Sequence, residues 1–203
     1  MSKNTGNTTV EDQTPAHVRD AVRTLLEWVG EDPGREGLRR TPERVALSLA
    51  QITGGTATDL DEILAGGVFP EKDAGLVLVR DIDFYSLCEH HLLPFFGRCH
   101  LAYLPAGRIV GLSKIPRLAD HFARGLQVQE RFTRQVTEAL DAAVQPQGVG
   151  CVVEAFHLCM AMRGVAKERA VAVTTFWTGV FASHPERRGE LDGLLAAGSR
   201  FRF

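Results

Sequence analysis

The first quarter of the chain carries two stretches in which apolar residues recur every three or four positions. Each stretch begins with a Thr-Pro pair, Thr14-Pro15 in the first and Thr41-Pro42 in the second. This spacing places apolar side chains on one face of a helix, and a capping hydroxyl before proline is typical of a helix start. We therefore predict two helices, the first ending at Gly30 and the second at Gly54-Gly55, with a loop over residues 31–40.

The remainder of the chain alternates short runs rich in branched and aromatic residues with two further helical patterns. The runs predict strands over residues 76–84, 95–104, 108–110, 149–159 and 171–181. One helix is predicted to begin at Ser113, and a longer one is marked by Val128, Phe132, Val136 and Leu140. Strands around a helical pair, without a regular βαβ alternation, predict an α+β fold with an antiparallel sheet.

These patterns divide the chain into three parts. Residues 1–13 are predicted to be a disordered tail, residues 14–68 an N-terminal helical segment, and residues 69–203 the catalytic domain that carries the sheet. The polar N-terminus lacks the apolar centre of a secretion signal, and no apolar run approaches the roughly 20 residues that span a bilayer. We expect a cytoplasmic protein without a membrane partner.

Charge narrows the range of partners. The formal net charge is -2, whereas a protein whose main partner is nucleic acid usually carries a basic excess. We therefore expect no nucleic-acid partner. A local basic pocket for one small anion is compatible with this charge.

The first candidate for chemistry is Cys88-Glu89-His90-His91, directly after a predicted strand. If the chain turns there, a cysteine and a histidine three residues apart can face one metal ion, and zinc accepts both thiolate and imidazole ligands. If the segment stays extended, Cys88 and His90 share a face instead. Spacing alone leaves both His90 and His91 as candidates.

A second half-site is His157-Leu158-Cys159, at the end of a predicted strand. Residues i and i+2 of a strand point the same way, so His157 and Cys159 are predicted to project together, one as a metal ligand and the other as a proton carrier. Two cysteines and one histidine leave the fourth position of a tetrahedral zinc site to water, as in catalytic rather than structural sites. Zinc lowers the pKa of such a water to about 7.

The competing interpretation of each half-site is a core thiol beside a hydrogen-bonded histidine. We adopt that interpretation for Cys99 and Cys151, which lie inside apolar runs. For the cysteine–histidine cluster we favour a metal site over disulfides, because cytoplasmic thiols stay reduced.

A candidate phosphate site is the stretch Gly111-Leu112-Ser113-Lys114-Ile115-Pro116-Arg117. Ser113 as an N-cap would place backbone N–H groups at a helix start, where anions bind. Lys114 and Arg117 fall on neighbouring faces of the first turn, and Arg163 could add a forked donor. The alternative is a solvated basic helix end.

The longer helix opens with Gln127-Val128-Gln129-Glu130-Arg131. Because Val128 belongs to the apolar stripe, Glu130 is predicted to point away from the core. A carboxylate accepts two hydrogen bonds side by side, which suits the N1–H and 2-amino edge of guanine. The alternative is an ion pair with Arg134, four residues further along the helix surface.

Taken together, these stretches resemble GTP cyclohydrolase I. The matching residues stand in the order and separation of that family: Cys88-Glu89-His90-His91, Gly111-Leu112-Ser113-Lys114, Gln127-Val128-Gln129-Glu130-Arg131, and His157-Leu158-Cys159 with Arg163-Gly164. The likeness runs from about Thr14 to Phe181. Four motifs in register are far more specific than any one of them.

The resemblance implies a role for each of these residues. Cys88, His91 and Cys159 would bind Zn²⁺, and His90 and His157 would be free for proton transfer. Glu130, with Gln129 beside it, would read the guanine edge. The residues implied for the ribose-triphosphate end are Leu112, Ser113, Lys114, Arg117, Arg163 and Arg44.

The resemblance also implies a fold, an assembly and a reaction. The fold would be the tunnelling fold, a small antiparallel sheet with two helices, here preceded by the N-terminal helical segment. Subunits of the family form a homo-oligomeric ring, usually a decamer, with active sites between neighbours. GTP would be the substrate: activated water attacks C8 of the purine while a histidine, His157, protonates N7. Formate leaves, and rearrangement gives 7,8-dihydroneopterin triphosphate, the entry compound of folate and pterin synthesis.

The sequence departs from the family pattern at a few positions. Ala170 and Ala172 stand where many relatives carry Ser or Thr, and Gly125 occupies a place that is commonly basic. The implied ligand set is complete. The alternative function is a non-catalytic purine- or pterin-binding protein braced by zinc. A related nitrile reductase would use a free cysteine as its nucleophile, which a metal-bound Cys88 does not supply.

Overall fold

The computed structural model describes residues 14–57 and 59–197, so the tail predicted for residues 1–13 lies outside the described residues. The chain divides into two compact units, residues 1–52 and 53–203. Among the described residues, no helix combines the length and the apolar composition needed to cross a membrane.

The first unit contains the two predicted helices, α2 (Ala16–Trp28) and α3 (Thr41–Thr53), with the expected loop between them. The start of α2 differs from the prediction, because the helix begins after Pro15 and no side chain caps it. The hydroxyl of Thr14 instead accepts a hydrogen bond from the Arg19 guanidinium at 3.2 Å. The Thr14 hydroxyl, which was expected to cap the helix, is therefore paired with the Arg19 side chain.

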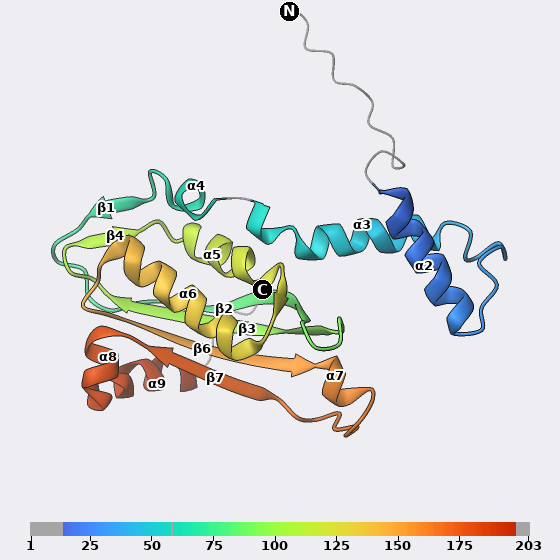
Figure 1. Ribbon diagram of the computed structural model, residues 1–203. Coiled ribbons are helices and arrows are strands. Elements are labelled where there is room, and N and C mark those ends of the chain that lie inside the picture. The colour runs from blue at the N-terminus through green and yellow to red at the C-terminus, as the bar shows by residue number, and fades with distance from the viewer. Residues whose placement is uncertain (1–13, 58, 198–203) are drawn as a thin grey trace, which may run out of the picture. The chain divides into compact units, whose positions relative to one another are not determined.

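The second unit is built on a five-stranded sheet with the order β5-β2-β3-β6-β7 (Figure 1). Its strands are β2 (Val77–Cys88), β3 (Pro94–Leu104), β5 (Leu126–Gln127), β6 (Gly148–His157) and β7 (Ala172–Trp177). The pairs β2–β3, β3–β6 and β6–β7 are antiparallel, as predicted. The short strand β5 pairs in parallel with the end of β2, so the sheet is mixed rather than purely antiparallel.

Two helices, α5 (Lys114–Ala123) and α6 (Gln129–Val144), lie along one face of this sheet (Figure 1). Three residues of the stripe predicted for α6, Phe132, Val136 and Leu140, are fully buried, whereas the fourth, Val128, precedes the helix in an extended conformation and is half-buried. The three buried residues pack with Phe95, Cys99 and Leu101, which lie an even number of residues apart along β3 and so share one face of the strand. Apolar spacing of about four in the helix and two in the strand thus creates one shared core, and the unit is an α+β fold.

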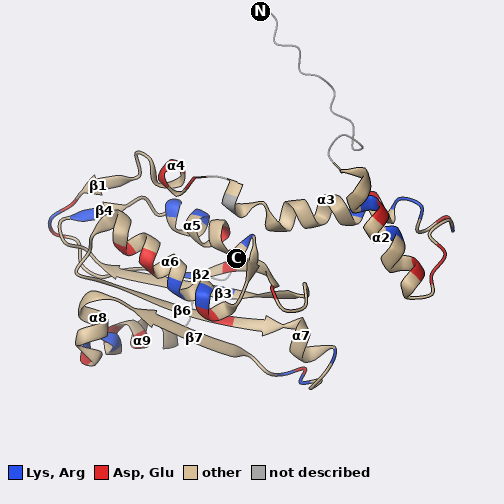
Figure 2. Cartoon of the chain, in the orientation of Figure 1, with Lys and Arg blue, Asp and Glu red and all other residues tan. Residues whose placement is uncertain are grey.

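Smaller elements surround this core. A two-stranded sheet pairs β1 (Val68–Pro70) with β4 (Arg108–Val110), and Val110 N–H donates to the buried Tyr103 hydroxyl at 3.0 Å. The remaining elements are η1 (Gly55–Ala57), α4 (Leu60–Leu64), α7 (Leu158–Ala161), α8 (Gly179–Ser183), η2 (Pro185–Arg187) and α9 (Arg188–Ala196). Figure 2 shows acidic and basic residues interspersed along α5 and α6, without segregation of one sign.

Two strands end earlier than predicted and one ends later. The strand expected over residues 149–159 stops at His157, where α7 begins, and the strand expected over 171–181 stops at Trp177 before α8. The strand expected over 76–84 continues to Cys88. The two early ends have one cause: apolar runs continue across the boundary between the strand and the short helix that follows, so periodicity does not mark the end.

Candidate metal centre and active site

The end of β2 turns sharply, and this turn sets the geometry of the first half-site. Cys88 N–H donates to the carbonyl of Leu93 at 2.9 Å, and its own carbonyl accepts from Leu92 N–H at 2.8 Å and from His91 N–H at 3.3 Å. Leu92 adopts a φ of 54°, in the left-handed region. Of the two alternatives left by the spacing, the turned form is therefore the one adopted.

The turn brings both histidines near the Cys88 thiol. The Sγ atom of Cys88 lies 3.9 Å from Nδ1 of His91 and 3.7 Å from Nδ1 of His90. Cys88 is buried, whereas both histidines are exposed. The buried thiol at the end of β2 thus lies next to two imidazoles that are exposed to solvent.

The second half-site is carried by a different element of secondary structure from the one predicted. Because β6 ends at His157, Cys159 lies in the short helix α7, and the argument from strand alternation was wrong. The Cys159 thiol nevertheless joins the first half-site: ligand atoms of Cys88, His91 and Cys159 all lie within 4.8 Å of one another. Among the described residues, these three form the group that could hold a metal ion.

The donor set and its spacing fit a tetrahedral zinc ion. With Zn–S near 2.3 Å and Zn–N near 2.0 Å, donors of one ion lie roughly 3.5–3.8 Å apart. The 3.9 Å between Cys88 and His91 is close to that range. Burial, and then the neighbouring Cys88 thiol, raise the pKa of Cys159, while the charge of Arg163 opposes the rise. A cation would reverse this effect by favouring thiolates.

His157 precedes Cys159 by two residues, and its ring is held on two sides. Its ring stacks on Phe95 with centroids 4.6 Å apart and an interplanar angle of 4°. Its Nε2 lies 2.7 Å from Oε1 of Gln129. Burial lowers the pKa of His157, and the Glu130 carboxylate partly offsets this. The imidazole is therefore fixed in position, and the Glu130 carboxylate is close enough to influence its pKa.

Glu130 is exposed at the start of α6, as predicted, and lines a cavity of about 490 Å³. The other lining residues are Val128, Arg131, Arg134, Thr174, Thr175 and Phe176. Within the described residues, the ion pair in this region joins Arg131 to Glu89 and does not involve Glu130 with Arg134. Glu130 thus lines this cavity together with Arg131 and Arg134, and in the described part of the chain it forms no ion pair with either.

The start of α5 differs from the predicted anion site. Ser113 has helical dihedrals and no capping hydrogen bond from its side chain. Lys114 N–H donates to Gly111 O at 2.8 Å and Ile115 N–H to Leu112 O at 3.3 Å, so a turn uses the donors that were expected to be free. Leu112 and Ser113 are exposed, and the Lys114 ammonium lies 3.3 Å from the Ala65 carbonyl.

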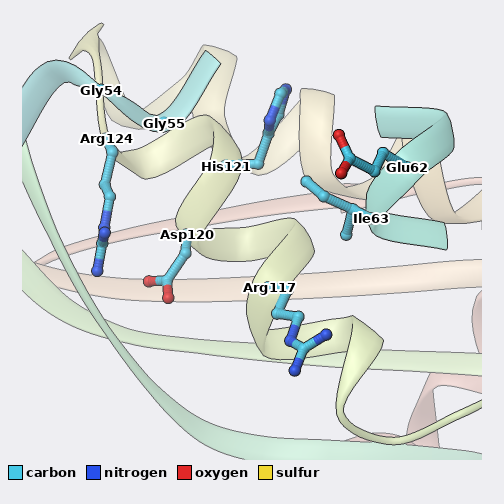
Figure 3. Close-up of a pocket in the computed structure, with 8 residues that line it drawn as sticks. All are labelled: Gly54, Gly55, Glu62, Ile63, Arg117, Asp120, His121 and Arg124. Atoms are coloured by element: carbon cyan, nitrogen blue, oxygen red, sulfur yellow. The ribbon is translucent and has the colours of Figure 1, made fainter. Parts of the chain in front are cut away.

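The remaining basic residues of the predicted phosphate site are dispersed. Arg117 lines a cavity of about 320 Å³ between α5 and the segment that carries η1 and α4 (Figure 3). Arg163 is exposed beyond α7, and Arg44 is exposed on α3 of the first unit. The structure gathers the cysteine–histidine cluster, but within the second unit it does not bring Lys114 or Arg117 to it.

Several residues around the site were not predicted. Phe95 stacks on His157, and Thr133 and Thr174 lie in a hydrogen-bonded group with Gln129. Gln129 itself is 3% exposed. The signal for its burial was present in the sequence, because Gln129 precedes Phe132 and Thr133 by three and four residues and so shares their helix face.

The fold and the cluster define an α+β protein with a candidate metal centre of two thiols and one imidazole, located where the strands β2 and β6 end. The GTP cyclohydrolase I family model matches residues 18–195. The GTP cyclohydrolase 1 of Chlorobium phaeovibrioides is 53% identical over 187 residues, covering 90% of this chain and 84% of that protein. The GTP cyclohydrolase 1 of Leptospira biflexa is 48% identical over 182 residues, covering 90% and 100%. The chain belongs to the GTP cyclohydrolase I family.

A more distant likeness appears among solved structures. The archaeosine synthase QueF-Like in its apo form matches with a TM-score of 0.45 and 17% identity, over 53% of this chain and 97% of that one. Likeness at this level has no bearing on the fold or the activity.

Proposed function

We propose that the protein converts GTP and water to formate and 7,8-dihydroneopterin triphosphate, with Zn²⁺ as its cofactor. The observation that carries the proposal is the Cys88, His91 and Cys159 group in a chain of this family. A zinc ion held there would supply a water activated for attack at neutral pH. We place the reaction in residues 69–203 and assign them to the tunnelling fold that the family resemblance implies.

The proton carriers in this proposal are His90 and His157. His157 is fixed by Phe95 and Gln129 and lies beside the thiols without belonging to the three-residue group. We assign it to protonate the purine, and the exposed His90 to a second proton transfer. His157→Ala is accordingly expected to keep the metal and to lose most turnover, since general acid–base catalysis supplies about 10²–10⁴-fold in rate.

Substrate contacts follow from the placement of the charged side chains. We propose that Glu130, which lines a cavity, accepts from the N1–H and 2-amino group of guanine. Ser113, Lys114, Arg117 and Arg163, with Leu112 beside them and Arg44 from the first unit, would bind the ribose-triphosphate end. Gln129 lies behind Glu130, and its side chain is turned toward His157.

We propose further that the active sites form between copies in a homo-oligomeric ring, a decamer. Support comes from the two ends of the ten-residue helix α5. Lys114 lies at its start, and Gln127, just beyond its end, pairs with Cys88 of the cluster. Ten helical residues span about 15 Å. The basic residues at the start of α5 are thus about one helix length from the cluster of their own chain, and a neighbour could receive them.

Formate release separates the enzyme from the alternative, a zinc-braced binding protein. Purified protein incubated with GTP is expected to yield formate and a pterin chromophore, and a chelator should stop both until zinc is restored. Zinc-loaded protein that binds GTP and leaves it unchanged would favour the binding protein.

Mixed oligomers test whether sites are shared. At GTP concentrations well below KM, Cys159→Ser and Lys114→Met copies are each expected to be weakly active alone. Reassembled together, they should regain activity, because some interfaces then combine an intact cluster with an intact α5. Activity that stays at the average of the two pure variants would show that each site lies within one copy.

A further inference from the structure

The side chain of Gln129 is the centre of a buried hydrogen-bond network joining α6, β6 and β7. Its Nε2 lies 3.1 Å from the Val153 carbonyl oxygen, 3.0 Å from the Ala172 carbonyl oxygen and 3.1 Å from the Thr174 hydroxyl. Its Oε1 lies 2.7 Å from Nε2 of His157. With 3% exposure, Gln129 directs its amide to protein groups, so it requires no ligand to satisfy it.

The network fixes the orientation of the Gln129 amide, that is, the positions of its oxygen and its nitrogen. Carbonyl oxygens only accept hydrogen bonds, so the amide atom that faces Val153 and Ala172 must be the NH₂ group. The opposite orientation would set Oε1 against two carbonyl oxygens. Assignment of an amide's oxygen and nitrogen rests on its partners, and here two backbone partners agree.

The two threonines are consistent with the same direction. The Thr133 hydroxyl donates to the Gln129 carbonyl at 2.8 Å and lies 2.6 Å from the Thr174 hydroxyl. Because a hydroxyl has one proton, Thr174 must donate to Thr133. The Thr174 oxygen is then left to accept from the Gln129 amide. The two N–H protons of the Gln129 amide are shared among three acceptors, the Val153 and Ala172 carbonyls and the Thr174 hydroxyl.

The direction of the loop determines the form of His157. Since Oε1 of Gln129 can only accept, the proton between it and His157 belongs to Nε2 of the imidazole. A neutral imidazole carries one N–H, so Nδ1 is then the unprotonated nitrogen. Stacking on Phe95, at an interplanar angle of 4°, keeps the ring plane fixed.

We propose that Gln129 is a positioning residue for His157: it holds the ring as the Nε2–H tautomer, so that Nδ1 is the nitrogen presented to the substrate. The identity of that substrate rests on the proposed function. The Nε2–H to Oε1 bond is kept whether the ring is neutral or protonated. The proton given to the purine nitrogen then leaves from Nδ1, and the ring is left neutral with Nε2–H in place. Gln129 acts from behind the site and does not read the base.

The tautomer can be measured without any substrate. Solid-state NMR of protein labelled with ¹⁵N-histidine distinguishes protonated from unprotonated ring nitrogens, and the signals lost in His157→Ala identify this residue. At a pH where the ring is neutral, we expect Nε2 protonated and Nδ1 bare. A neutral His157 that carries its proton on Nδ1 would overturn the inference, whatever the protein does with GTP.

Substitutions add a kinetic test. Gln129→Leu is expected to lower kcat about 10–100-fold, as loss of a supporting hydrogen bond behind a reactive histidine commonly does, with little change in KM for GTP or in bound zinc. Gln129→Glu keeps an acceptor for Nε2–H but sets a carboxylate oxygen against the Val153 and Ala172 carbonyl oxygens, so it should retain the tautomer at a cost in stability. Thr174→Val is the matched control, because Val153 and Ala172 still orient the amide.

The outcomes separate this inference from the proposed function. A raised KM with unchanged kcat and tautomer in Gln129→Leu would mean that Gln129 contacts the base, and the inference would be wrong. Wild-type protein that releases no formate from GTP would refute the proposed function and leave the measured tautomer standing.

Discussion

The cysteine cluster and the start of α5 are both formed by turns of the backbone, yet only the cluster gathers its side chains. At Cys88 the backbone hydrogen bonds fix the turn, and short side chains from two distant segments meet within 4.8 Å. At α5 the turn uses up its own N–H groups, and the basic side chains extend separately from it.

The two regions differ in whether the folded chain alone brings their functional side chains together. Thiols and imidazoles have few rotatable bonds, so a fixed backbone nearly fixes their donor atoms. Long Lys and Arg side chains lose up to about 2 kcal/mol of rotamer entropy when they are held. The candidate cation site is thus formed within one chain, whereas the basic side chains proposed to bind the phosphates remain apart from one another.

The largest effect is expected from breaking the cluster. Cys159→Ser removes one of three ligands, and activity should fall by more than the 10–100-fold typical of groups behind the ligands. Elemental analysis should show loss of zinc in parallel with formate release.

The matched control is Cys151→Ala, which removes a buried thiol 3.6 Å from that of Cys99 and away from the cluster. It should keep zinc and turnover at some cost in stability. A Cys159→Ser protein with full zinc content would show that the cluster is not the metal centre.

A smaller effect is expected at Glu130. Glu130→Gln replaces one acceptor with a donor, which opposes the guanine 2-amino group. Hydrogen bonds to charged groups contribute about 1.5–3 kcal/mol, so kcat/KM for GTP should fall about 10–100-fold. Inosine triphosphate lacks the 2-amino group, and the preference for GTP over it should shrink in the variant.

Glu138→Gln, exposed on the same helix, is the control and should leave that preference unchanged. An equal fall for both nucleotides in Glu130→Gln would place the carboxylate elsewhere than at the base edge.

The same contrast explains what the sequence could predict. Apolar spacing correctly predicted α3, α6, β3 and β4, because burial imposes the period. The paired half-sites were found because metal ligands must be specific residue types. Periodicity could not show that Cys159 lies in α7, since the apolar run continues past His157. The prediction that Ser113 caps α5 was wrong, because a cap depends on the backbone dihedral angles of one residue, and composition does not determine these angles.

At α5 itself we expect a moderate effect that depends on the phosphates. Lys114→Met removes an ammonium whose Nζ lies 3.3 Å from the Ala65 carbonyl oxygen. KM for GTP should rise about tenfold, at the lower end for charged hydrogen bonds, while guanosine binding stays unchanged. Arg124→Gln, at the opposite end of α5, is the control. Weaker binding of guanosine as well as GTP would mean that Lys114 supports the fold or the base, not the phosphates.

The smallest effect tests the turn at α5 directly. Ser113→Ala should change stability by less than about 0.5 kcal/mol, the usual range for surface substitutions, because no hydrogen bond from the Ser113 side chain caps the helix. Asp59 provides the comparison, since its Oδ1 accepts from Asp61 N–H at 3.2 Å at the start of α4. Asp59→Ala should therefore cost about 1 kcal/mol. Urea unfolding measures both. If Ser113→Ala lowers the free energy of unfolding as much as Asp59→Ala does, then Ser113 caps α5 in solution and its cap replaces the turn hydrogen bonds. The contrast between the cysteine cluster and the start of α5 would then weaken.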